Sequence, residues 1–312
     1  MTVTSRTLRL GTRRSALALA QAGLIADALR GKGHEVSLVE VVTEGDRSSA
    51  ALTQLGGTGV FVTALRRQLA EGAIDIAVHS LKDLPTAPAE GLAIAAVPLR
   101  EDPRDALVSR DRTQLNQLSE GATVGTGSPR RAAQLRALGL GLEIVAIRGN
   151  VDTRLRRVAD GDLDAVVVAA AGLSRLGRVG EAAELLDPGQ LLPAPGQGAL
   201  AVECRADDES LVDGVRRALD DASTRAAVTA ERALLSALEA GCTAPVGALA
   251  DVAAGDNGED EIYLRGTVTA VDGSRAVRLS ITGPVADGDR LGRQLAADLL
   301  DAGAAELIGE SP

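Results

Sequence analysis

Short apolar runs of strand length alternate with amphipathic stretches of helix length through the first two-thirds of this chain. Leu8 to Gly11 predicts a strand, and Ser15 can cap a following helix that runs to about Arg30 with apolar residues on one stripe. Residues 36–42 and 74–78 predict two further strands. This alternation is typical of α/β folds, in which functional side chains follow the carboxyl ends of strands.

The alternation is interrupted by the charged run from Arg100 to Asp105 and then restarts, which predicts a second α/β unit. In this second unit we expect strands and helices in turn at residues 123–125, 129–138, 142–147, 151–159 and 165–169. Leu191 to Gln197 contains two prolines and predicts a linker. The strand predicted at Ala199 to Cys204 can then return to the first unit.

From about Asp220 the pattern changes. A long helix is expected at residues 223–240, strands near 248, 262–271 and 275–282, and a final helix at 287–302. Helix, three strands and helix predict a small α+β domain. A chain of 312 residues is long enough for two or three such domains.

Charge and composition exclude several classes of function. The net charge of −10 argues against binding to nucleic acid or anionic membranes. The longest uncharged apolar run, Ala165 to Leu173, is far shorter than the ~20 residues that span a bilayer. The start of the sequence has no apolar signal segment, so we expect a cytoplasmic protein. His34 and His79 are the only histidines, and no Cys/His cluster has metal-ligand spacing, so no metal site is expected.

Lys82 is one of two lysines among 33 basic residues, in the run His79-Ser80-Leu81-Lys82-Asp83. A lysine kept in such an arginine-rich chain suggests a need for a compact ammonium group. Because the run follows a predicted strand, Lys82 and Asp83 are candidate site residues. A surface ion pair in a turn explains the same pattern equally well.

Three predicted strand-to-helix turns carry paired basic residues. They are Leu10 to Ser15, Gly125 to Arg131 and Arg148 to Arg154. Because a helix N-terminus already favours anions, arginine there opposes the helix dipole, and a bound anion would compensate. One such turn alone would be explained better by a solvated helix end, but three together predict an anion pocket. The absence of a P-loop or Rossmann motif favours carboxylate over phosphate. Arg175 either joins this pocket or lies at the surface.

The two cysteines have different settings. Cys242 lies between Gly241 and Pro245 in a predicted exposed loop, which makes it a candidate nucleophile or attachment point, although an inert loop cysteine fits as well. Cys204 lies within a predicted strand and is most simply a buried small hydrophobe.

Five motifs in this order resemble the porphobilinogen deaminase (hydroxymethylbilane synthase) family: residues 79–85, 125–131, 148–154, 192–198 and the Cys242 loop. The resemblance implies two doubly wound α/β domains with mixed sheets, like the lobes of periplasmic binding proteins, and a small α+β domain with a three-stranded antiparallel sheet. The domains expected are residues 1–99 with 199–217, residues 100–198, and residues 218–312, which carry the cysteine loop.

The resemblance also implies a transferase of haem biosynthesis. Four porphobilinogen molecules would be joined, with loss of ammonia, to a dipyrromethane cofactor held by Cys242 through a thioether, and water would release hydroxymethylbilane. Asp83 matches the family's catalytic carboxylate, which stabilises cationic pyrroles and transfers protons. The positions that match cofactor and substrate contacts are Arg13, Ser15, Phe61, Ser80, Lys82, Thr126, Ser128, Arg130, Arg131, Arg148, Arg154, Arg175 and Gln197. A monomer is expected from the family.

This sequence departs from the family pattern in one loop. Gln54, Thr58 and Thr63 stand where lysines are common, which leaves a charged role of this loop in doubt.

Two other functional classes compete with this interpretation. A two-lobed anion receptor would suit the arginine crevice but leaves Cys242 unexplained, and a thiol acyltransferase would lack a histidine partner.

Overall fold

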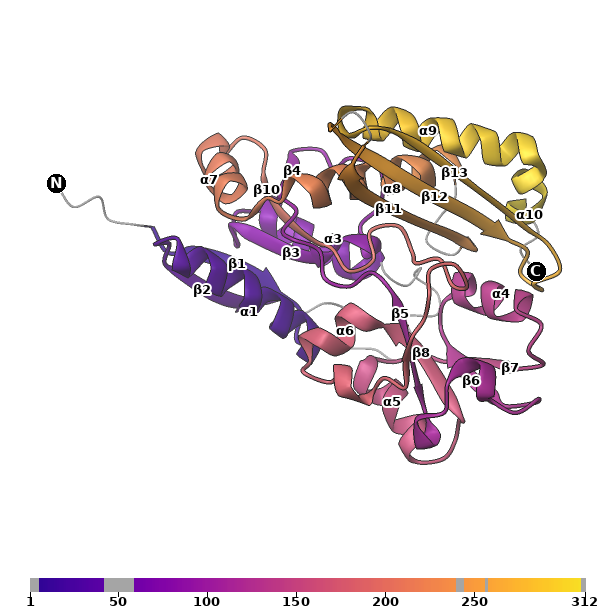
Figure 1. The fold of residues 1–312 in the computed structure, drawn as a ribbon. Coiled ribbons are helices and arrows are strands. Elements are labelled where there is room, and N and C mark those ends of the chain that lie inside the picture. Colours follow the sequence, from indigo (N-terminus) through magenta and orange to yellow (C-terminus); the bar gives the residue numbers. More distant parts are fainter. Residues whose placement is uncertain (1–5, 42–58, 240–243, 256–257, 310–312) are drawn as a thin grey trace. The chain divides into compact units, whose positions relative to one another are not determined.

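A computed structural model describes residues 6–41, 59–239, 244–255 and 258–309 (Figure 1). The chain forms two compact units. The first comprises Met1–Arg100 and Ala199–Arg225, and the second comprises Glu101–Gly198 and Ala226–Pro312. Three sheets are present in the described residues, one in the first unit and two in the second. The division into three domains stays a prediction.

The first unit holds a mixed five-stranded sheet with the order β2-β1-β3-β10-β4. β1 is parallel to β2 and β3, whereas β10 runs antiparallel to β3 and β4, so the predicted return of the chain is confirmed. The strands are β1 (Leu8–Thr12), β2 (Val36–Glu40), β3 (Ile76–Ser80), β4 (Leu92–Ala96) and β10 (Leu200–Arg205).

Helices cover both faces of this sheet. They are α1 (Ala16–Gly31), α3 (Gly59–Ala70) and α7 (Glu209–Leu219). Ile76 and Val78 of β3 pack in the core that α1 and α7 share, whereas the intervening Ala77 packs in the core beneath α3. This alternation follows from the two-residue period of a strand, and it makes the unit doubly wound.

The second unit contains a sheet of the same design, with the order β7-β6-β8-β5-β9. β6 is parallel to β7 and β8, and β5 is antiparallel to β8 and β9. The strands are β5 (Asp105–Ser109), β6 (Thr123–Thr126), β7 (Glu143–Ala146), β8 (Ala165–Ala169) and β9 (Glu184–Leu185). The helices are α4 (Pro129–Ala137), α5 (Val151–Ala159) and α6 (Ala170–Arg175).

The third sheet is antiparallel, with the order β11-β12-β13. Its strands are β11 (Val246–Ala254), β12 (Asp260–Thr269) and β13 (Ala276–Pro284). α8 (Ala222–Ala237) and α9 (Gly288–Leu299) share one apolar core with it, and a short π-helical segment and α10 (Ala305–Gly309) follow (Figure 1). α9 approaches α8 closely at Gly292, where a Cβ atom would overlap the Ala230 carbonyl. The fold class expected from the sequence is therefore confirmed.

The helix start predicted at Ser15 is confirmed, and a second helix begins with the same kind of cap. The Ser15 hydroxyl accepts a hydrogen bond from the Ala18 N–H, and Ser128 caps α4 with Pro129 as the first helical residue. β5 and α7 were not predicted. β5 begins at Asp105, the last residue of a charged run, and a buried acid at a strand start gives no apolar signal in the sequence.

Candidate functional site

In the first unit, predicted site residues follow two adjacent parallel strands. Arg13 and Ser15 come after β1, whereas Ser80, Lys82 and Asp83 end or follow β3. Because both strands run in the same direction, these residues lie at one edge of the sheet. The side chain of Gln21, from α1, donates to the Ser80 hydroxyl at 3.0 Å and joins the helix to this edge.

The turn that carries Lys82 and Asp83 is anchored by its apolar residues. Leu81 is buried, its N–H donates to the Ala199 carbonyl at 3.0 Å, and its carbonyl accepts from the Leu84 N–H at 3.1 Å. Leu81–Asp83 form a single 3₁₀ turn in which Lys82 and Asp83 are only half-buried. The two polar side chains are thus held on a fixed backbone and remain accessible.

A buried ion cluster supports the strand that leads into this turn. His79 Nε2 lies 3.1 Å from the Glu203 carboxylate, to which Arg66 donates from Nε at 3.0 Å and from Nη2 at 2.7 Å. Burial alone would raise the pKa of Glu203, but the nearby His79 and the hydrogen bonds from Arg66 lower this pKa to about 2. Arg66 and Glu203 were not predicted from the sequence. A glutamate inside the apolar run of β10 was the available signal.

In the second unit, the other predicted residues follow the carboxyl ends of three parallel strands. Thr126 ends β6, Arg148 follows β7, and Arg175 ends the helix after β8. The Ser128 N–H donates to the Thr126 hydroxyl at 3.2 Å, and the Ser128 hydroxyl accepts from the Arg131 N–H at 3.4 Å. These bonds fix the start of α4 at this edge of the sheet.

Arg130 and Arg131 are buried and bonded to one carboxylate, that of Asp105. Arg131 donates to Asp105 Oδ1 from Nε at 3.0 Å and from Nη2 at 2.7 Å, and Arg130 Nη2 donates to Oδ2 at 2.8 Å. Gln197, also buried, donates to Asp105 Oδ1 at 2.8 Å. The structure therefore gives these predicted ligand residues a protein partner that the sequence did not suggest.

Arg154 and Arg175 are less well compensated. Arg154 Nε donates to the Gly149 carbonyl at 2.9 Å, and Arg175 Nη2 donates to the Gly198 carbonyl at 2.5 Å. Burial lowers the pKa of both guanidinium groups; nearby Arg131 lowers that of Arg154 further, whereas Glu101 partly restores that of Arg175. Partly buried cations with lowered pKa values favour an anionic ligand.

Two family models match the chain. The model described as "Porphobilinogen deaminase, dipyromethane cofactor binding domain" matches residues 8–213, and the model described as "Porphobilinogen deaminase, C-terminal domain" matches residues 225–301. The chain belongs to the porphobilinogen deaminase family. It is therefore an enzyme of tetrapyrrole synthesis, and the competing interpretation as a receptor is rejected.

Curated proteins agree with this assignment over nearly the whole length. Porphobilinogen deaminase from Nocardia farcinica is 58% identical and matches 98% of this chain and 89% of its own. Porphobilinogen deaminase 1 from Streptomyces coelicolor is 58% identical and matches 99% of both chains. Among solved structures, the methionine-binding protein MetQ matches 68% of this chain and 89% of its own at 16% identity, with a TM-score of 0.43. A structural likeness of that extent carries no functional argument.

We call the edge of the second unit's sheet that carries Arg130, Arg131, Arg148, Arg154 and Arg175 the arginine edge. It fits a ligand with several carboxylates, such as the family's dipyrromethane group. Within the described part of the chain, Asp105 pairs with Arg130 and Arg131, and Glu101 lies near Arg175, whereas Arg154 pairs with no carboxylate. Arg148 is exposed at the same edge. Buried Arg130 Nε finds no acceptor in the described part of the chain. Excess positive charge and an unsatisfied buried donor both suit a polyanion.

Cys242, Gln54 and Thr58 lie outside the described residues, as does the side chain of Phe61, whereas Thr63 is exposed on α3. The predicted residues of the first unit and those of the second unit belong to separate bodies, so their convergence on one crevice stays a prediction. Cys204 is buried as expected, and burial is the main cause that raises its thiol pKa to about 12.

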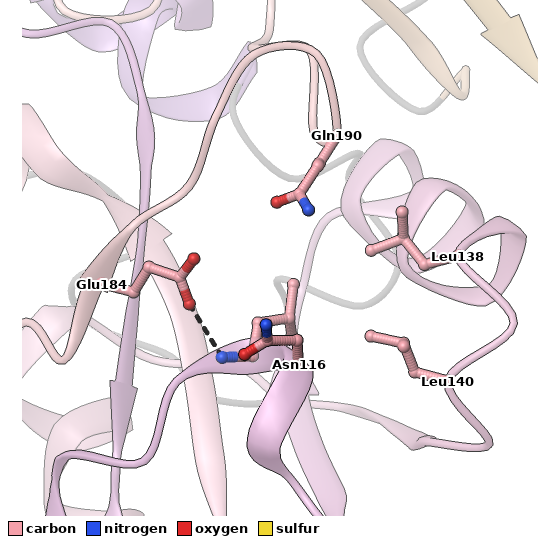
Figure 2. A pocket seen from close by; sticks show the side chains of 6 residues that line it. Asn116, Leu138, Leu140, Glu184 and Gln190 are labelled. Atoms are coloured by element: carbon pink, nitrogen blue, oxygen red, sulfur yellow. Dashed lines mark hydrogen bonds between the residues drawn. The ribbon is translucent and has the colours of Figure 1, made fainter.

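Other features of the described residues add no competing site. No group of acidic, histidine or cysteine side chains there has the arrangement of a metal site, and no helix there is long and apolar enough to cross a bilayer. A pocket of about 190 Å³ lies in the second unit, and the Glu184 carboxylate in it accepts from the Leu115 N–H at 2.8 Å. Figure 2 shows the side chains that line it. Its remaining lining residues are Asn116, Leu138, Leu140 and Gln190, and none of the predicted site residues lines it.

Proposed function

We propose that this chain joins four porphobilinogen molecules, with loss of ammonia, onto a dipyrromethane cofactor held by Cys242 through a thioether, and releases hydroxymethylbilane by hydrolysis. The observation that carries this proposal is the surplus of arginine over carboxylate at the edge of the second unit's sheet. Membership of the porphobilinogen deaminase family supports it. When bound, the cofactor supplies the pyrrole carbon to which the first substrate is joined.

The arginines neutralise ligand carboxylates. Each porphobilinogen carries an acetate and a propionate, so the negative charge grows by two with each addition. Arg154 and Arg175 gain most from such an anion. In the described residues, the cost of burying these cations is offset by carbonyl dipoles and, for Arg175, by Glu101. Arg130 and Arg131 would share their charge between Asp105 and the ligand, and exposed Arg148 would meet groups entering from solvent.

Asp83 is the proposed catalytic residue. When the C–N bond of the substrate breaks, its electron pair leaves with ammonia and positive charge spreads over the pyrrole ring. A carboxylate beside the ring stabilises this cation and can take the proton that is lost when the new C–C bond forms. The anchored 3₁₀ turn holds the Asp83 backbone in place for this role.

The remaining predicted contacts have supporting roles. Lys82 offers a compact cation to a ligand carboxylate, and the hydroxyl groups at the two sheet edges offer hydrogen bonds. These hydroxyl groups belong to Ser15, Ser80, Thr126 and Ser128, and Arg13 would add a charge in the first unit. Phe61 is proposed to pack over the substrate ring, and Gln197 is proposed to line a hinge between domains. We also expect a cytoplasmic protein that is a monomer. Light scattering after size exclusion tests the monomeric state.

The mass of the denatured protein tests the attachment. We expect an excess that corresponds to a covalent dipyrrole, either as purified or after incubation with porphobilinogen, on the peptide that contains Cys242. Cys242→Ala should show the mass of the bare chain. Cys204→Ala is the matched control and should carry the group, because the Cys204 thiol is buried with its pKa raised to about 12. An excess on Cys242→Ala, or a parent protein that stays bare with substrate, would reject the proposal.

A further inference from the structure

The segment Leu192–Gln197, called the strap below, lies within the second unit and leads from β9 towards β10. It has no regular secondary structure, yet Leu192 is 1% exposed and Gln197 is fully buried. A buried irregular segment must satisfy its backbone groups through specific partners. The partners of the strap come from two different sheets of the unit and their helices.

On one side the strap is held by α4. Gln134, which is buried, bonds to both backbone groups of Leu192: its Nε2 donates to the carbonyl at 3.0 Å, and its Oε1 accepts from the N–H at 2.8 Å. Arg130 Nη1 donates to the same carbonyl at 2.6 Å. The strap is thus fixed to the helix that begins at the arginine edge.

On the other side the strap is held by the third sheet and its helix. The Ala248 N–H of β11 donates to the Pro193 carbonyl at 2.9 Å. The buried Glu231 carboxylate of α8 accepts from the Gly196 N–H at 2.6 Å and from the Ala250 N–H at 2.8 Å. Gly247 lies so close that a Cβ atom there would be 2.8 Å from the Leu192 carbonyl oxygen.

We infer that the strap fixes the position of the third sheet relative to the arginine edge. Gln134 is the positioning residue that holds the strap in place. This inference rests on the proposed function. β11 starts four residues after Cys242, so its position limits where a group on that cysteine can reach. The rate at which a tethered group meets its binding residues depends on its effective concentration, and a displacement of about 1 Å can cost roughly 100-fold.

Gln134→Leu tests the inference, because leucine fills similar space and removes both bonds to Leu192. Thr123→Val is the control: it also removes two hydrogen bonds, here partly buried ones to Asp164, at the opposite end of β6. Hydrogen exchange is measured on the unloaded chains. We expect faster exchange of the Leu192 and Ala248 amides in Gln134→Leu, and unchanged exchange of these amides in Thr123→Val.

Covalent loading is the second readout, followed by mass after porphobilinogen is added well below both unfolding midpoints. We expect loading to be about tenfold slower in Gln134→Leu and unchanged in Thr123→Val. A purely structural role of Gln134 would lower its unfolding midpoint without slowing loading under these conditions. Equal loading rates, or unchanged exchange at Leu192 and Ala248, would overturn the inference.

Gly247→Ala approaches the strap from the opposite side and keeps the inference testable if Gln134→Leu does not fold. The added methyl group would push the Leu192 carbonyl, so loading should slow as in Gln134→Leu. Gly180→Ala is its control, because a Cβ atom there meets open space. Normal loading of Gly247→Ala would overturn the inference, whereas a parent chain that never loads would reject the proposed function and the inference with it.

Discussion

Arg131 donates two hydrogen bonds to a single oxygen of Asp105, at 2.7 and 3.0 Å, and both side chains are buried. Burial opposes ionisation of Asp105, but Arg130 and Arg131 hold its pKa well below the usual range. The carboxylate therefore stays charged at all ordinary pH values. It holds both guanidinium groups at the edge of the sheet before any ligand arrives.

Removal of this charge should cost much of the stability of the second unit. Asp105→Asn leaves two buried cations without their counter-charge, and we expect the free energy of unfolding to fall by about 3–5 kcal/mol in urea titrations. Asp102→Asn is the control, because its pair with Arg104 is partly exposed, and it should cost less than about 1 kcal/mol. Equal losses in the two variants would contradict the proposed importance of burial.

Stability at acid pH should depend on Glu203. Its folded pKa of about 2 lies below its ordinary value of 4.5, so its contribution is complete above pH 4.5 and is lost as the pH falls from 4.5 towards 2. The shift corresponds to on the order of 3 kcal/mol. Glu203→Gln should flatten this part of the stability curve, measured by urea unfolding at several pH values. A variant with the parent's slope would show that Glu203 is not the titrating group.

Asp83→Asn should stop the chemistry and spare the fold. Its side chain is half-buried on a turn held by Leu81, so the unfolding midpoint should change little. Loss of the carboxylate should slow ammonia release at saturating porphobilinogen by at least about 100-fold. This rate is measured as ammonia released over fixed times, on protein whose mass shows that the cofactor is attached. Turnover within a few-fold of the parent would remove Asp83 from the catalytic role.

Arg154 and Arg156 lie on the same helix and should respond differently to substitution. Arg154 is partly buried with its pKa lowered, whereas Arg156 is exposed. Arg154→Gln should raise KM for porphobilinogen about tenfold or more, because a charge-assisted bond to carboxylate is lost. It should leave stability unchanged or slightly higher, since repulsion from Arg131 is relieved. Arg156→Gln should keep KM within about twofold, and a similar rise in both variants would argue against a specific anion site.

Much of the local structure was predictable because its signals are short-range. Ser15 and the pair Ser128-Pro129 mark helix starts through bonds within three residues, and the Ala199 to Cys204 run marks a buried strand. The residues that follow the strands were candidates because each predicted strand marks where its carboxyl end lies, and parallel strands bring these ends to one edge.

The supporting residues were not predictable from such signals. Asp105 belongs in sequence to a charged break, yet it starts a buried strand because its partners Arg130 and Arg131 arrive from α4. Glu203 meets Arg66 across 137 positions of sequence, and Gln134 meets Leu192 across 58. A polar side chain gives no sign of burial until its partner is known.

The sequence by itself determined the alternating α/β pattern, the α+β end of the chain, the family and the residue types at each strand end. The tertiary structure decided which of these charges are buried and what each one contacts. The physical reason is that strand, helix and cap preferences act between near neighbours, whereas the cost of burying a charge is offset only by groups that folding brings close. Folding brings together Asp105 and its two arginines in this way. It does the same for the strap and the two sheets that hold it.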